Sequence, residues 1–229
     1  MSKKKIKVKV KKRKINIKRI IICLVIIILI VSIGYYLSKM PIKNIYIAGN
    51  KILSDREIIE LSGIEDYPPI IAITNKNIIK KIKDNIYIED VQVKKKIGGK
   101  LYITIEEKKI LCAYNEKLIL EDGNIIENNH NITNYPILIS DITAIQDLFI
   151  SSFSLIEDEI LLKISEIEYT PNDVDKERFT LKMNDGNMVF VTLNKVEKIN
   201  KYNSIYSSLD GKKGIIYLDS GDYVEIKEE

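Results

Sequence analysis

The pattern of hydrophobic and polar positions divides this 229-residue chain into three parts, and the first is a continuous apolar run. Residues 20–37 carry no charge and are mostly Ile, Leu and Val. At about 1.5 Å per residue, a helix over this run spans about 27 Å, close to the ~30 Å hydrocarbon core of a bilayer. Tyr35 and Tyr36 stand at its far end, where aromatic rings favour the headgroup region. The pattern predicts a transmembrane helix over residues 20–37.

A short juncture over residues 38–41 leads to a second part, residues 42–109, with the predicted order strand, helix, helix, strand, strand. Ser54 and Glu57 have the spacing of a capping box and begin the first helix, and Gly63 ends it. Alternation of apolar and polar residues marks the strands. The expected elements are strands at residues 44–47, 91–95 and 101–106, a second helix at 75–84, and a turn at Gly98-Gly99.

The third part, residues 110–226, consists mostly of short alternating segments separated by turn residues. Asp185-Gly186 between two apolar segments is a strong hairpin signal. Helices are expected over residues 142–150, 157–164 and 195–209. Strands are expected over residues 111–114, 117–120, 125–127, 135–139, 167–170, 179–183, 188–193 and 214–218, with 223–226 as a candidate partner for the last.

These patterns place the chain in the α+β class: a transmembrane helix, a βααββ domain with an antiparallel or mixed three-stranded sheet, and a mainly antiparallel β domain with flanking helices. Residues 227–229 are expected to be a short C-terminal end.

Charge orients the predicted helix. Residues 1–19 hold eleven Lys or Arg and no acid, whereas 25 basic and 32 acidic residues follow from Ile20 onward, a net of −7. The positive-inside bias therefore predicts a cytoplasmic N-terminus and an extracytoplasmic bulk. A cleaved signal peptide is the alternative, but the apolar run is long and no small-x-small cleavage site follows it. The basic tail is expected to attract anionic lipid headgroups and not nucleic acid, because it adjoins the span and has no interleaved aromatic residues.

Candidate catalytic groups are few. The single histidine, His130, stands in an Asn-rich loop, and Cys112 has no histidine near it in sequence. The motifs of serine hydrolases, zinc proteases and nucleotide-binding loops are missing from the sequence. Cys23 lies in the predicted span and Cys112 outside it, so the two do not pair within one chain. The sequence therefore predicts a non-enzymatic protein without a cofactor or metal.

The order of these landmarks resembles the FtsQ/DivIB family of bacterial cell-division proteins, which carry one span and a βααββ unit of the POTRA type. The matching segments are residues 45–50 (IYIAGN), 88–96 (IEDVQVKKK), 101–108 (LYITIEEK), 118–126 (LILEDGNII) and 135–138 (YPIL), followed by Asp185-Gly186 and the Lys198-Ile199 helix. Gly98-Gly99 stands where the family often has a Pro-containing turn. The resemblance covers nearly the whole chain.

The resemblance implies a non-catalytic divisome scaffold in the cytoplasmic membrane, concentrated at the division septum. Its implied partners are FtsL-like and DivIC/FtsB-like bitopic proteins and, through them, the septal transpeptidase and glycan polymerase. Two alternatives stay open at this point. A membrane-anchored cell-wall enzyme would need catalytic motifs, and a POTRA-type chaperone for β-barrel assembly usually has several POTRA units and a barrel.

The resemblance also implies that the last strands of the β domain bind the DivIC/FtsB-like partner. We expect the segment 214–218 to form a sheet edge, because a terminal strand has no later element to cover it, with an interior strand as the alternative. The expected partner-binding residues are Ile215, Ile216, Tyr217 and Leu218 on this strand, and Lys198 and Tyr202 on the helix beside it.

Overall fold

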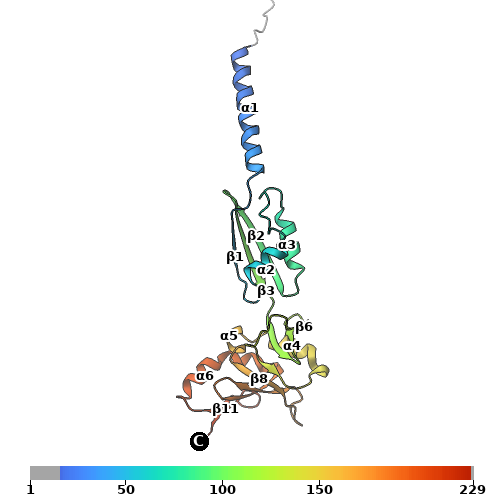
Figure 1. The fold of residues 1–229 in the computed structure, drawn as a ribbon. Coiled ribbons are helices and arrows are strands. Elements are labelled where there is room, and N and C mark those ends of the chain that lie inside the picture. Colours follow the sequence, from blue (N-terminus) through green and yellow to red (C-terminus); the bar gives the residue numbers. More distant parts are fainter. Residues whose placement is uncertain (1–15, 228–229) are drawn as a thin grey trace, which may run out of the picture. The chain divides into compact units, whose positions relative to one another are not determined.

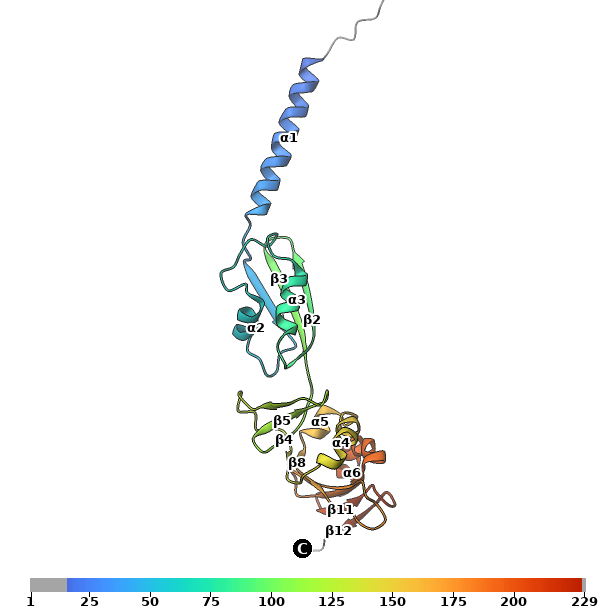
Figure 2. The same cartoon turned by 90° about the vertical axis from the view of Figure 1, so that its right-hand side faces the viewer.

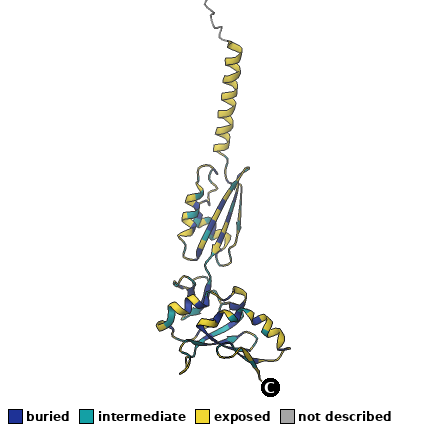
Figure 3. Cartoon of the chain, turned by 180° about the vertical axis from the view of Figure 1, so that it is seen from behind, coloured by how far each residue is buried: buried dark blue, intermediate teal, exposed yellow. Residues whose placement is uncertain are grey.

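The computed structural model describes residues 16–227, which begin with a single long helix and continue into two compact units. Helix α1 (Ile17–Ser38) has 22 residues, which makes it about 33 Å long. It is exposed along its whole length (Figure 3) and is long and apolar enough to cross a membrane. The predicted span at residues 20–37 lies inside it.

The first unit comprises residues up to Ile86 together with Asp90–Ile105. Its elements are β1 (Asn44–Ala48), α2 (Asp55–Ser62), α3 (Asn75–Lys83), β2 (Ile88–Lys96) and β3 (Lys100–Glu107), the predicted βααββ order (Figure 1). The sheet order is β1-β3-β2, with β1 parallel to β3. Strands β2 and β3 are joined by a tight turn and are therefore antiparallel, so the sheet is mixed.

Local signals explain where the elements of this unit begin and end. The Ser54 side chain accepts the Glu57 N–H, and the Glu57 carboxylate accepts the Ser54 N–H at 2.7 Å, which confirms the capping box. Gly63 ends α2 in the left-handed conformation. Ile58 from α2 and Ile78 and Ile82 from α3 are buried with the inward residues of the strands, so the two helices cover one face of the sheet.

The second unit contains a nine-stranded sheet of order β12-β11-β10-β9-β8-β7-β4-β5-β6. Five of its strand pairs are antiparallel and three are parallel, which confirms the mainly antiparallel prediction. The strands are β4 (Ile110–Tyr114), β5 (Lys117–Leu120), β6 (Ile125–Glu127), β7 (Ile137–Leu138), β8 (Ile164–Tyr169), β9 (Arg178–Met183), β10 (Met188–Thr192), β11 (Gly214–Tyr217) and β12 (Tyr223–Ile226).

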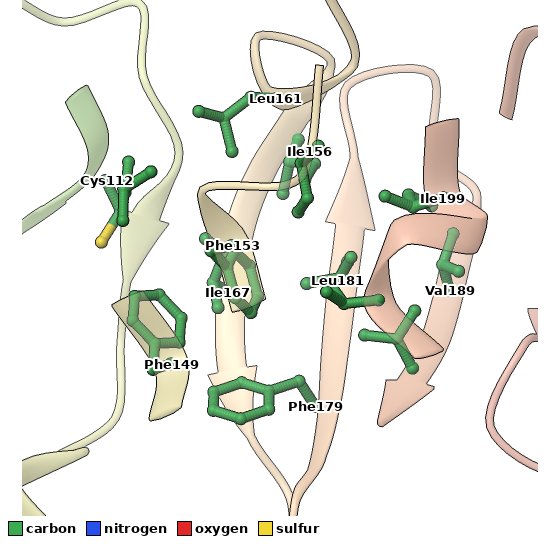
Figure 4. Packing of buried hydrophobic residues seen from close by; sticks show 14 of the residues in the cluster. Cys112, Phe149, Phe153, Ile156, Leu161, Ile167, Phe179, Leu181, Val189 and Ile199 are labelled. Carbon is green, nitrogen blue, oxygen red and sulfur yellow. The ribbon is translucent and has the colours of Figure 1, made fainter. Parts of the chain in front are cut away.

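Helical segments pack on one face of this sheet (Figure 2). They are η1 (Thr143–Ile145), α4 (Gln146–Phe153), α5 (Asp158–Leu161), η2 (Leu193–Lys201) and α6 (Tyr202–Ser208). Phe149 and Phe153 of α4 stack at 4.1 Å and meet Phe179 of β9 at 5.5 and 5.6 Å, as Figure 4 shows. The core of the second unit is therefore a helical layer packed against one side of the sheet.

Three sequence predictions are wrong in part. The helix expected over residues 195–209 is a 3₁₀ helix, η2, that continues into α6. The helix expected over 157–164 ends at Leu161, because Ile164 already pairs with Met183 as the first residue of β8. The strand at 214–218 is not the edge of the sheet: the chain reverses after it and adds β12 on its outer side.

Candidate partner-binding site

The outermost strand of the sheet, β12, pairs with no strand on its outer side among residues 16–227. It pairs with β11 in antiparallel register, and the N–H of Lys227 donates to the carbonyl of Lys213 at 2.9 Å. Opposite residues in an antiparallel pair alternate between hydrogen-bonded and non-bonded. Since 213 and 227 are bonded, Tyr223 and Glu225 direct their backbone groups at β11. The N–H and C=O groups of Val224 and Ile226 therefore point away from it, toward the open side.

On the outer face of the sheet, away from the helices, an aromatic row leads to this edge. The ring centroids of Phe190 and Tyr217 are 5.2 Å apart, and those of Tyr217 and Tyr223 are 4.5 Å apart. The Arg178 guanidinium carbon lies 3.9 Å from the centroid of Phe190. Three neighbouring strands thus contribute one continuous aromatic surface, with a cation at its inner end.

A salt bridge anchors that cation. The Nε of Arg178 donates to the Oδ2 of Asp219 at 2.8 Å, and both side chains are largely buried. Burial acts to raise the pKa of Asp219, but hydrogen bonds from Arg178 and Ser220 outweigh it, and the pKa is lower than usual. Asp219 is therefore ionised at neutral pH and fixes the guanidinium over the ring.

The inner side of the same edge holds a groove of about 420 Å³. Ile216, Leu218 and Val224 provide its apolar residues, and Lys198 and Asp222 form an ion pair of 2.6 Å beside them. A hydrogen bond from Lys198, together with its charge, lowers the pKa of Asp222, and Lys195 and Lys201 add to the effect. The remaining lining residues are Lys201, Ser204, Ile205, Ser208 and Tyr223.

The 3₁₀ form of η2 accounts for this arrangement of charge. With three residues per turn, residues i and i+3 eclipse one another. Val196 and Ile199 therefore share one buried row that continues to Tyr202, while Lys195, Lys198 and Lys201 share a second row. Lys198 and Lys201 of this row line the groove, and the charges of all three lysines lower the pKa of Asp222.

The structure places the six expected binding residues in different environments. Ile216 and Leu218 are buried against the core and also line the groove. Lys198 lines the groove as well. Ile215 and Tyr217 lie half-buried on the outer face, which agrees with the expected alternation. Tyr202 does not belong to the surface: it is 1% exposed, because its position in the helical layer turns it inward. That part of the prediction is wrong.

Sequence reasoning missed the groups that form the edge itself. Val224 and Ile226 were recognised only as part of a candidate pairing strand, and Arg178 and Phe190 were not considered. A turn signal was present in the sequence, since Gly221-Asp222 separates two alternating segments and Asp222 adopts a positive φ of 51°. That signal predicts a hairpin and hence an edge strand beyond β11.

The candidate catalytic residues lie apart from this edge. Cys112 is fully buried in the core, and burial raises the pKa of its thiol well above the ordinary value, so it is a poor nucleophile. His130 packs edge-on against Tyr87, with ring centroids 5.2 Å apart. Within residues 16–227, no three His, Cys, Asp or Glu side chains group in a way that could hold a metal ion.

Comparisons with known proteins agree with this architecture. Residues 40–108 match the family model of the POTRA domain, FtsQ-type, and residues 112–224 match that of cell division protein FtsQ/DivIB, C-terminal. The chain is 31% identical over 194 residues to the cell division protein DivIB of Bacillus subtilis, covering 80% of this chain and 73% of that protein. DivIB of Listeria monocytogenes is 28% identical over 207 residues, with 83% and 75% covered.

A solved structure is also similar to part of the chain: the major extracytoplasmic domain of the trans isomer of DivIB from Geobacillus stearothermophilus. It has 20% identity and a TM-score of 0.38, and covers 46% of this chain and 96% of that domain.

The chain has the features of a POTRA protein with an apolar N-terminal helix: that helix, a POTRA unit, and a β-rich unit with an open sheet edge. Within that class, the chain belongs to the FtsQ/DivIB family of cell division proteins. Membership supports a role in cell division, and α1 supports a single-pass membrane protein.

Proposed function

We propose that this chain is a non-catalytic scaffold of the division machinery, and that its second unit binds a DivIC/FtsB-like bitopic protein by strand addition at β12. The observation that carries the proposal is the pair of outward-directed backbone positions at Val224 and Ile226. An extended partner segment pairing there would satisfy these groups, and its alternate side chains would contact the aromatic row and the groove. An FtsL-like protein would join the same assembly and connect it to the septal transpeptidase and glycan polymerase.

The sheet has a second edge, β6, which provides the natural comparison. The bond from the Leu120 N–H to the Asn124 carbonyl, 2.9 Å, means that Ile125 and Glu127 direct their backbone groups outward. However, the Glu127 carbonyl accepts the Tyr87 hydroxyl at 3.4 Å and also the Asn129 N–H at 3.0 Å. Because β6 has one of its two outward carbonyls occupied and lacks the aromatic row, we assign the partner to β12.

Proline at Ile226 tests the assignment. It removes an N–H that faces the open side and leaves the β11–β12 hydrogen bonds in place, a position where edge strands tolerate proline. Ile226→Pro should fold, as judged by circular dichroism, yet lose about 5- to 30-fold in affinity for a DivIC/FtsB-like ectodomain, because an outward N–H lost from a ladder costs on the order of 1–2 kcal/mol.

The matched control is Ile125→Pro on the opposite edge. Ile125 and Ile226 are both 45% exposed, and both N–H groups face outward. The control should retain full affinity. Loss of binding in Ile125→Pro with normal binding in Ile226→Pro would move the site to β6, and unchanged affinity in both would exclude strand addition to this sheet.

The cellular role calls for a separate measurement. Depletion of the protein should block septation with little effect on elongation, and a fluorescent fusion should concentrate at the septum. Normal septa after depletion would contradict a divisome role.

An assay of the purified chain on peptidoglycan tests the enzyme alternative, and hydrolysis or transfer above background would overturn the non-catalytic assignment.

A further inference from the structure

The end of the first unit that adjoins α1 is built from three segments held together by backbone hydrogen bonds. The Ile42 N–H donates to the Pro68 carbonyl at 3.1 Å, and the Ile70 N–H donates to the Met40 carbonyl at 3.0 Å. The Lys43 N–H donates to the Gly99 carbonyl at 2.8 Å. We call this end the proximal face; it consists of residues 39–43, the loop 65–74 and the hairpin tip 94–100.

The covalent chain keeps the proximal face near the end of the apolar helix. Helix α1 ends at Ser38, five residues before Lys43. A fully extended chain covers at most about 3.6 Å per residue, so Lys43 lies within about 18 Å of the helix end, and Gly99 of the hairpin is hydrogen-bonded to Lys43. This holds for any orientation of the unit. If α1 spans a bilayer, the proximal face is therefore always close to the lipid headgroups.

Two exposed isoleucines stand on this face. Ile97, at the tip of the β2–β3 hairpin, is 97% exposed, and Ile71 is 62% exposed. The loop that carries Ile71 is tied to β2, since the Asn75 side chain donates to the Val93 carbonyl at 2.9 Å and the Lys95 ammonium donates to the Ile73 carbonyl. A single exposed apolar residue needs no explanation, but two on one face beside a membrane helix indicate an apolar partner.

The charge of the proximal face is strongly positive. Residues 39–43 and 94–100 contain six lysines and no acid, and the loop between Ile64 and Thr74 adds only Glu65 and Asp66. Lys96 extends over the Tyr102 ring, with its Nζ 4.5 Å from the centroid. The exposed lysines are Lys39, Lys43, Lys94, Lys96 and Lys100.

We propose that the proximal face binds the bilayer surface beside α1, with Ile97 and Ile71 inserted between headgroups and the lysines against the phosphates of anionic phospholipids. Apolar tips flanked by lysines match the two components of such a surface, its acyl boundary and its negative headgroups. This docking would fix the orientation of the POTRA unit relative to the membrane, in addition to the anchoring by α1.

A single tryptophan tests the contact, because the chain has none. The Ile97→Trp variant of the full chain is reconstituted in phosphatidylglycerol vesicles with and without brominated acyl chains, which quench indole only at contact range. The matched control is Val174→Trp, since Val174 is also 97% exposed but lies in the second unit. Ile97→Trp should show blue-shifted emission and several-fold stronger quenching than Val174→Trp. Equal quenching of both, or quenching of neither, overturns the proposal.

A second arm tests the lipid charge. Adding Lys96→Gln and Lys100→Gln to Ile97→Trp should reduce the quenching several-fold, as should replacement of phosphatidylglycerol by phosphatidylcholine. Both lysines are exposed, so the variant keeps its fold, which circular dichroism verifies. If neither the lysine substitutions nor the change to phosphatidylcholine reduces the quenching, anionic headgroups play no part. That result would overturn their assignment as the partner.

Discussion

At the scale of single residues, a chain of buried hydrogen bonds joins α6, the β9–β10 turn and β11. The Tyr202 hydroxyl donates to Asp185 at 2.6 Å and accepts from the Asn187 side chain at 2.9 Å. The carbonyl oxygen of that side chain accepts the Gly214 N–H at 2.8 Å, at the first residue of β11. Tyr202 is therefore a buried residue that helps to hold the first residue of β11 in place.

Removing the hydroxyl tests this role. Tyr202→Phe should lower the free energy of unfolding by about 1–3 kcal/mol, because the buried side-chain NH₂ group of Asn187 would lose its acceptor. Urea unfolding of the purified chain, followed by circular dichroism, measures the change. Tyr206→Phe is the control: Tyr206 is adjacent on α6 but 45% exposed, and its variant should stay within about 0.5 kcal/mol. Equal stability of the two variants would contradict the role assigned to the buried chain.

At the scale of elements, η2 shows why a repeat of three is ambiguous. Val196, Ile199 and Tyr202 recur every three residues, a spacing that fits both an α-helix and a 3₁₀ helix. Sequence reasoning chose the α form over the whole segment, and the structure has the α form only from Tyr202. The 3₁₀ geometry matters because it places Lys195, Lys198 and Lys201 in one row, and two of them, Lys198 and Lys201, line the groove.

The turn after β1 provides an element-scale prediction in the first unit. Gly49 has a φ of +94°, and a Cβ there would lie 2.0 Å from the Ile105 carbonyl oxygen. Gly98 has a similar φ of +89° with open space around it. Gly98→Ala should cost only the backbone strain of about 1–2 kcal/mol. Gly49→Ala should cost more, because β1 must also move away from β3.

Thermal unfolding of both variants measures the difference. A melting temperature for Gly49→Ala equal to or above that of Gly98→Ala would show that the close approach to Ile105 does not constrain this turn.

At the scale of the whole molecule, the question is on which side of the membrane the two units lie. The eleven basic residues at positions 1–19, of which Lys18 and Arg19 lie in the first turn of α1, predict that the N-terminus stays in the cytoplasm. Protease added to intact protoplasts should then digest both units and leave an N-terminal stub. A chain that is digested only after lysis would have the opposite orientation.

The sequence by itself determined the features that depend on neighbouring residues. The apolar run, the capping box at Ser54 and the glycines at Gly63 and Gly98-Gly99 each act within a few residues, so α1 and the βααββ unit were predictable element by element. The ordered landmarks likewise identified the family.

Only the tertiary structure decided the order in which the strands from β4 to β11 lie in the sheet. Strand β11 pairs in parallel with β10 after the η2–α6 connection. Strand β12 then pairs antiparallel with the other side of β11. The two-residue strand β7 links the two halves of the sheet in the same way, by pairing with β4 and β8. Such choices depend on hydrogen bonds between segments far apart in the chain, which no local pattern encodes. The β11–β12 hairpin is the exception: the Gly221-Asp222 turn is a local signal, and the prediction of an edge at residues 214–218 did not use it.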